Sequence, residues 1–191
     1  MFDLILNYFN SSTIVTFFVI FTLSVYFIII VWIFTYKYLL LVKLVTNEKD
    51  SLAILLNKES LNQDSKTVSS LDRCISKGGV YSKDVLDAFI ISLIRESSVG
   101  ISWLSIIAST SPFIGLFGTV VGILESFSKF SIESQVSFSI IAPAISEALV
   151  ATAAGIFVAI FAYTFHQLLN RKIYEYDTYL NTRAKLLLKD I

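Results

Sequence analysis

Three long runs of apolar residues constrain the fold of this chain more than any other feature. They cover residues 14–36, 101–125 and 138–169 of a 191-residue sequence that is 55% hydrophobic and 16% charged. A helix needs about 20 apolar residues to cross the hydrocarbon core of a bilayer, and each run reaches that length. Because backbone groups inside a bilayer must be hydrogen-bonded within the protein, such runs favour helices. The sequence therefore predicts an all-α membrane protein with three transmembrane helices.

Positive charge is distributed unevenly between the segments that connect these runs. Every lysine and arginine except Lys129 lies in residues 37–100 or in the C-terminal tail. Because cytoplasmic loops carry the excess of basic residues, we expect both basic segments in the cytoplasm and the N-terminus outside. The predicted segments are an external N-terminus (1–13), transmembrane helix 1 (14–36), a cytoplasmic helical loop (37–100), transmembrane helix 2 (101–125), a short external linker (126–137), transmembrane helix 3 extending inward (138–169) and a cytoplasmic amphipathic tail (170–191).

Composition also argues against several classes of function. The formal net charge is zero and no basic block occurs, so we expect no nucleic-acid partner. Cys74 is the only cysteine, which excludes an intrachain disulfide and a cysteine-based metal cluster. The sequence contains no phosphate loop, no metal-ligand spacing and no polar catalytic cluster. We therefore expect no enzyme activity, no cofactor and no metal site.

Small residues form a stripe along each of the second and third runs. Lipid tails provide no hydrophobic drive for helix association, so close contact through small residues must hold such helices together. We expect this packing to involve Gly115, Gly118, Gly122, Ala148, Ala151 and Gly155. A second stripe, in the tail, is apolar and amphipathic, and we expect it to pack against neighbouring helices. It consists of Leu169, Ile173, Tyr176, Leu180, Ala184 and Leu187.

A single carboxylate, Glu147, lies inside the third run, about 14 Å along the helix from Phe138. A charge at that depth costs about 2.5–3.5 kcal/mol on insertion scales, so an ionisable residue there indicates a functional site. Two interpretations stay open. Glu147 either exchanges protons with a water-filled path or serves as a structural hydrogen-bonding group.

The same two runs carry motifs of a known family. SPFIGLFGTVVGI (111–123) and IAPAISEALVATAAG (141–155) resemble the second-helix and third-helix signatures of the ExbB/TolQ proteins. The resemblance covers roughly residues 109–167. This sequence has Ala144, Phe161, Val121 and His166–Gln167 where the family usually has glycine, proline, tryptophan and tyrosine–asparagine. The phenylalanine leaves open whether the third helix bends at that position.

The resemblance implies a bacterial inner-membrane energiser whose N-terminus is periplasmic. Family members form a ring-like homo-oligomer, a pentamer of three-helix subunits, around a pore that holds the helices of an ExbD/TolR-type partner. That partner carries a proton-binding aspartate, and proton flow drives work on the outer membrane. By resemblance, Thr119, Glu147 and Thr152 line the proton path, and a TolA- or TonB-type protein receives the work.

Within the family, the short external N-terminus favours the TolQ branch, which acts in the Tol-Pal system, envelope integrity and cell division. The alternatives are an ExbB-like energiser of TonB-dependent uptake and a flagellar-stator-type subunit. A stator subunit would be expected to have four transmembrane helices rather than the three predicted here.

Overall fold

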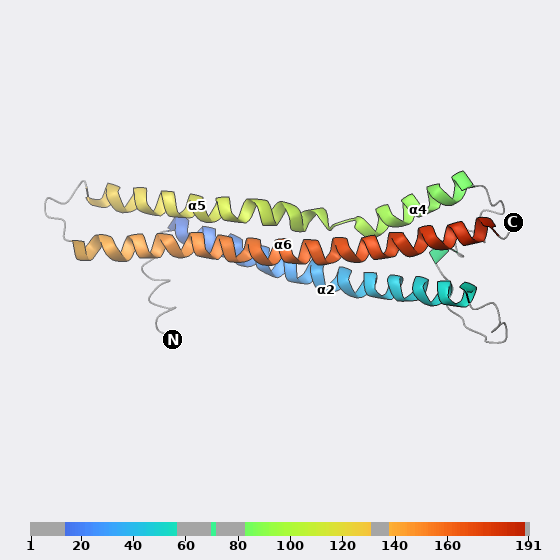
Figure 1. Ribbon diagram of the computed structural model, residues 1–191. Helices are drawn as coiled ribbons and strands as arrows, with labels where there is room; N and C mark the ends of the chain where they lie inside the picture. Colours follow the sequence, from blue (N-terminus) through green and yellow to red (C-terminus); the bar gives the residue numbers. More distant parts are fainter. Residues whose placement is uncertain (1–13, 57–69, 72–82, 131–137, 190–191) are drawn as a thin grey trace. The chain divides into compact units, whose positions relative to one another are not determined.

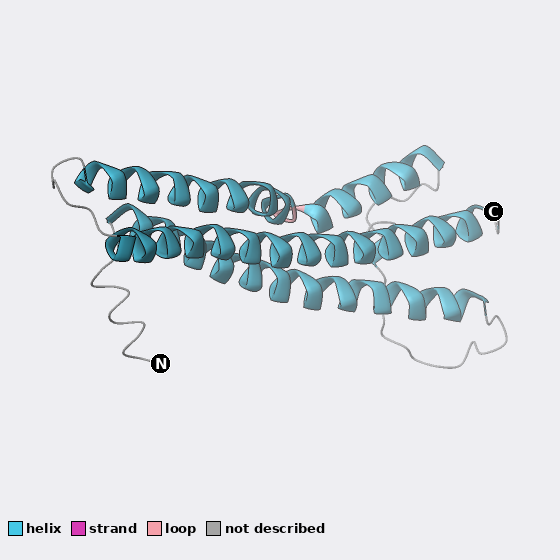
Figure 2. Ribbon diagram, turned by 60° about the vertical axis from the view of Figure 1, so that its left-hand side comes forward, coloured by secondary structure: helices cyan, strands magenta, loops and turns pink. Residues whose placement is uncertain are grey.

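A computed structural model describes residues 14–56, 70–71, 83–130 and 138–189. These ranges contain helices α2 (Ile14–Leu56), α4 (Lys83–Ser98), α5 (Ser102–Phe130) and α6 (Phe138–Lys189), labelled in Figure 1. Figure 2 shows helix throughout the described ranges, apart from the short turn between α4 and α5. The predicted all-α fold is confirmed. Three of the helices, α2, α5 and α6, are long and apolar enough to cross a membrane.

The chain divides into two compact units. Unit 1 comprises Met1–Trp32 and Trp103–Phe165, and unit 2 comprises Ile33–Ser102 and His166–Ile191. The first part of α2, nearly all of α5 and the first part of α6 belong to unit 1. The rest of α2, α4 and the end of α6 belong to unit 2. The predicted segments 1–13 and 126–137 lie wholly or mostly outside the described residues.

Unit 1 has a narrow core and an apolar exterior, as expected of helices in a bilayer. Its buried hydrophobic residues are Val19, Leu23, Ile30, Ile107, Ala151, Val158 and Ala162. Large apolar side chains such as Phe18, Phe113 and Ile160 are exposed. Polar side chains on the exterior bond to their own helix, since the hydroxyls of Thr22 and Ser24 donate to backbone carbonyls one turn earlier. Such bonds satisfy hydroxyl groups where no water is available.

Unit 2 is a packed helical bundle. Its core consists of Val45, Leu71, Leu86, Ile90, Tyr176, Leu180 and Ala184. Three of these residues, Tyr176, Leu180 and Ala184, belong to the apolar stripe predicted in the tail. Residues distant in sequence thus share one hydrophobic core.

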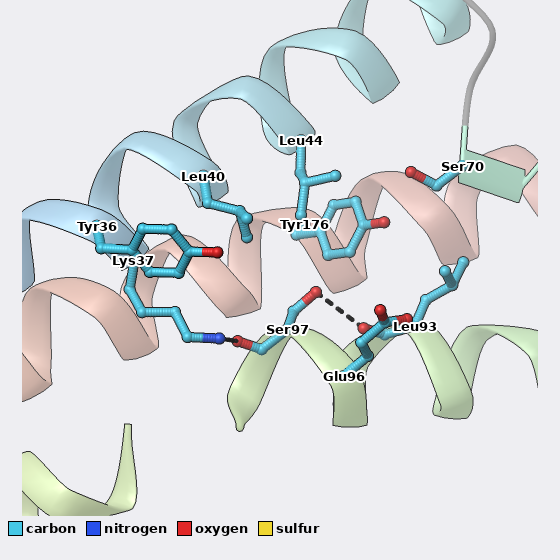
Figure 3. Close-up of a pocket in the computed structure, with 9 residues that line it drawn as sticks. All are labelled: Tyr36, Lys37, Leu40, Leu44, Ser70, Leu93, Glu96, Ser97 and Tyr176. Carbon is cyan, nitrogen blue, oxygen red and sulfur yellow. Dashed lines mark hydrogen bonds between the residues drawn. The ribbon is translucent and has the colours of Figure 1, made fainter. Parts of the chain in front are cut away.

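Helix α4 ends against α2 within unit 2. The backbone passes through Gly100 with φ of 85°, a left-handed conformation that glycine adopts without strain. The Lys37 ammonium donates a hydrogen bond of 3.3 Å to the Ser97 carbonyl, which places a positive charge at the C-terminus of α4. Figure 3 shows this contact at the edge of a cavity of about 440 Å³, which Tyr36, Glu96 and Tyr176 also line.

Candidate functional site

The glycines predicted to pack α5 against α6 lie at a close approach of the two helices in unit 1. A Cβ atom on Gly155 would lie 2.6 Å from the Ser111 carbonyl oxygen and 3.0 Å from the Gly115 Cα. A Cβ atom on Gly115 would lie 2.7 Å from the Ala151 carbonyl oxygen. Since these neighbours are backbone atoms, they cannot rotate away as a side chain would. Only glycine at both positions allows the two backbones to come this close.

The other predicted packing residues extend this contact along both helices. Ala148 and Ala151 are 1% and 0% exposed. A Cβ atom on Gly118 would lie 2.9 Å from the Val19 Cγ1, so α2 also packs at this level. At Gly122 the corresponding distance is 3.3 Å, to the Ala148 Cβ, so the fit there is looser. All six residues predicted to pack the helices are buried.

Two threonine hydroxyls meet at this crossing. The Oγ1 atoms of Thr119 and Thr152 are hydrogen-bonded to each other. Thr119 Oγ1 also lies 3.1 Å from the Ala148 carbonyl oxygen, and Thr152 Oγ1 lies 3.3 Å from the Gly115 carbonyl oxygen. Each hydroxyl carries one proton, so one threonine can donate to the other, which then donates to a carbonyl. Either threonine can be the first donor, so the pair has two possible proton arrangements.

Glu147 lies on α6, shortly before Thr152 in sequence but on another side of the helix. It is half-buried, and its Oε1 atom is buried. Thr152 follows five residues later, about 7.5 Å along the axis and roughly 140° around the helix. The structure therefore brings the two threonines together at one point and places Glu147 more than one turn closer to the start of α6.

Phenylalanines cluster on α2 and α6 in unit 1, a feature that the sequence analysis missed. The Phe161 ring packs edge-on against Phe27 at 5.6 Å and lies 4.8 Å from the Phe157 ring. Phe165 extends the cluster, with its ring 6.0 Å from that of Phe161. Helix α6 continues without interruption through Phe161. The spacing of four residues between Phe157, Phe161 and Phe165 was the signal that could have revealed this cluster.

Metal binding finds no support among the side chains that the structure describes. In residues 14–56, 70–71, 83–130 and 138–189, no group of three or more His, Cys, Asp or Glu side chains could hold a metal ion.

Three helices long and apolar enough to cross a membrane, two of which meet at a polar crossing, are the features of a multi-pass membrane protein. The chain belongs to the MotA/TolQ/ExbB proton channel family, whose model matches residues 75–182. That range includes α4, α5 and most of α6, and hence the whole crossing.

Relatives from several bacteria support this assignment. A Helicobacter pylori (strain J99) protein named ExbB-like 1 is 41% identical over 192 residues, which cover 98% of each chain. Biopolymer transport protein ExbB of Neisseria gonorrhoeae is 47% identical over 79 residues, or 41% of this chain and 36% of that protein. Tol-Pal system protein TolQ of Pseudomonas aeruginosa is 42% identical over 79 residues, or 40% of this chain and 34% of that protein.

The hydroxyl pair gives a first testable prediction. Replacing Thr119 or Thr152 with valine keeps the side-chain shape but removes one hydrogen bond across the α5–α6 contact. Hydrogen bonds between membrane helices contribute about 0.6 kcal/mol on average and at most about 1.7 kcal/mol. We expect each variant to assemble and to keep part of the wild-type activity, with the double variant weaker than either single one. The measurement is the growth of a strain that lacks the gene and expresses each variant in its place. Thr22→Val, which removes a hydroxyl bonded only within α2, is the matched control. Full activity of the double variant would show that the pair has no role in function.

Proposed function

We propose that this chain is the channel-forming subunit of an inner-membrane motor that converts the proton gradient into work on the outer membrane. The observation that carries the proposal is a hydroxyl pair at a glycine-mediated helix crossing, with a half-buried carboxylate more than one turn away on the same helix, in a chain of a proton channel family. An ionisable group within a membrane segment is costly and is found where ions or protons pass. We assign the chain no enzymatic activity and no cofactor.

In this proposal Glu147 is the residue that gains and loses the proton. A carboxyl group can accept a proton when ionised and donate it when protonated. It can then pass the proton on when water or a partner's polar group reaches it. The Thr119–Thr152 pair extends the polar path, because its two proton arrangements allow either hydroxyl to receive a hydrogen bond.

The proposed assembly is a homo-oligomer, a pentamer, with an ExbD/TolR-type single-helix protein in its pore. Unit 1 alone leaves large apolar side chains exposed on α5 and α6, among them Phe117, Leu124 and Ile156. Lipid or neighbouring subunits must cover them in the membrane. The distribution of lysine and arginine supports a periplasmic N-terminus and a cytoplasmic C-terminus in the bacterial inner membrane.

Two branches of the family remain candidates for the system that the motor serves. Two relatives that align with 98% of this chain carry ExbB in their names, which favours energised uptake through a TonB-type protein. The local identity to TolQ proteins, 50% over 60 residues in Haemophilus influenzae, supports the Tol-Pal alternative and a TolA-type protein. The short N-terminal segment does not separate the branches, because the ExbB-like relatives share nearly the whole layout.

Deleting the gene distinguishes these branches. In the uptake branch we expect loss of growth on substrates that enter through gated outer-membrane receptors, such as iron chelates, with normal detergent resistance. In the Tol-Pal branch we expect detergent sensitivity and chains of undivided cells. Re-expression of the wild-type chain should restore the phenotype in either case. A deletion strain with neither defect would contradict the proposed function.

A further inference from the structure

A buried ion pair joins two distant parts of the chain in unit 2. The Arg183 guanidinium on α6 lies 3.2 Å from the Glu48 carboxylate on α2. The two side chains are 5% and 0% exposed. The other Glu48 oxygen, Oε1, accepts a hydrogen bond of 2.8 Å from the backbone N–H of Ser70. Glu48 thus connects three segments: α2, residues 70–71 and the end of α6.

The buried face of α2 becomes partly polar near Glu48. At Leu41 and Val45 it is apolar, whereas in the last turns before Leu56 it includes Glu48 and Ser51 beside Leu52. The ion pair thus lies where polar and apolar side chains are both buried, beside the core residues Leu180 and Ala184.

Burying two charges is costly, and their mutual attraction often does no more than offset the lost hydration. Such pairs contribute little to net stability compared with a well-packed apolar substitute, but removing only one partner is strongly destabilising. A buried pair at the end of a bundle therefore makes the docked arrangement intolerant of losing one charge alone, whereas losing both charges together can be tolerated.

We propose that Glu48 and Arg183 form a polar clamp that closes the end of unit 2. The clamp holds the last turns of α6 against α2 and fixes Ser70–Leu71, whose leucine is part of the unit 2 core. Both residues are positioning residues. Their action is to keep the α6 tail docked, and this inference does not depend on the proposed proton path.

Distance measurements by electron spin resonance test the clamp. Spin labels would be attached at Ala53→Cys and Lys185→Cys, two exposed positions on α2 and α6, in a Cys74→Ser background. Co-assembly with excess unlabelled protein in lipid nanodiscs limits the signal to distances within one subunit. In the labelled protein without further substitutions, we expect a single narrow distribution of the distance between the two labels. Arg183→Met leaves a buried carboxylate without its cation. In this variant we expect a broad distribution of label-to-label distances that extends about 10 Å, one helix diameter, beyond the distance in the protein without this substitution.

Three further variants separate the clamp from general damage to the fold. Glu48→Gln combined with Arg183→Met removes both charges and keeps an acceptor for the Ser70 N–H, so it should restore the narrow distance. Arg183→Lys keeps the charge and should also remain closed. Lys172→Met with Glu175→Gln removes a partly exposed ion pair within α6 and should change nothing. The proposal fails if Arg183→Met keeps the narrow distance, or if the charge-free double variant is as open as Arg183→Met.

Discussion

Replacing Glu147 with glutamine should abolish gradient-driven function while the protein still assembles in the membrane. Glutamine keeps the length, the shape and most of the hydrogen bonding of the side chain, but it cannot take up and release a proton. Glu147→Ala should fail in the same way. Neither change adds a cost of insertion, because an ionisable group at mid-membrane depth is itself unfavourable by about 2.5–3.5 kcal/mol. Loss of function should therefore occur without loss of protein.

Growth complementation of a deletion strain measures this effect, and quantification of the membrane-bound protein verifies the expression of each variant. Glu125→Gln is the matched control, because it neutralises another carboxylate in unit 1, near the end of α5. The competing interpretation makes Glu147 a structural hydrogen-bonding group. Full complementation by Glu147→Gln would support that interpretation and remove the carboxylate from the proton path.

Enlarging Gly155 should prevent assembly of the membrane-spanning part. In Gly155→Leu, the first side-chain carbon would already lie 2.6 Å from the Ser111 carbonyl oxygen and 3.0 Å from the Gly115 Cα. Helices α5 and α6 would have to separate, which also breaks the Thr119–Thr152 hydrogen bond. Overpacking of this kind costs about 1–3 kcal/mol, and more where the neighbours are backbone atoms that cannot adjust.

The measurement is native mass spectrometry of the purified protein, with Gly122→Ala as the control. The added carbon at Gly122 would be 3.3 Å from the Ala148 Cβ, a contact that a shift of a few tenths of an ångström relieves. We expect the wild-type stoichiometry for Gly122→Ala and smaller species or aggregates for Gly155→Leu. An unchanged oligomer in Gly155→Leu would contradict the role of this crossing in assembly.

The helices of this chain could be predicted from sequence, because each signal is local. The lengths of the apolar runs indicated three helices able to cross a membrane, and the three- and four-residue spacing of small residues indicated which faces of α5 and α6 meet. The contact of Thr119 with Thr152 was less accessible. It depends on how far α5 is displaced along α6, which a pattern within one helix does not determine.

Contacts between distant segments were beyond the reach of such patterns. Val19 reaches Gly118 from a helix with no glycine or alanine in its apolar run, so nothing in that run marked the contact. Glu48 and Arg183 are separated by 135 positions and look like ordinary surface charges in the sequence. Only the shared core of unit 2 explains why both are buried.

Proton uptake by liposomes tests the central claim, that Glu147 carries the proton, most directly. The liposomes would hold the purified complex of this chain with its ExbD/TolR-type partner, under an imposed pH gradient and membrane potential. We predict uptake above background for the wild-type complex and for Glu125→Gln, and background uptake for Glu147→Gln in a complex of unchanged composition. Uptake by Glu147→Gln at the wild-type rate would contradict the claim.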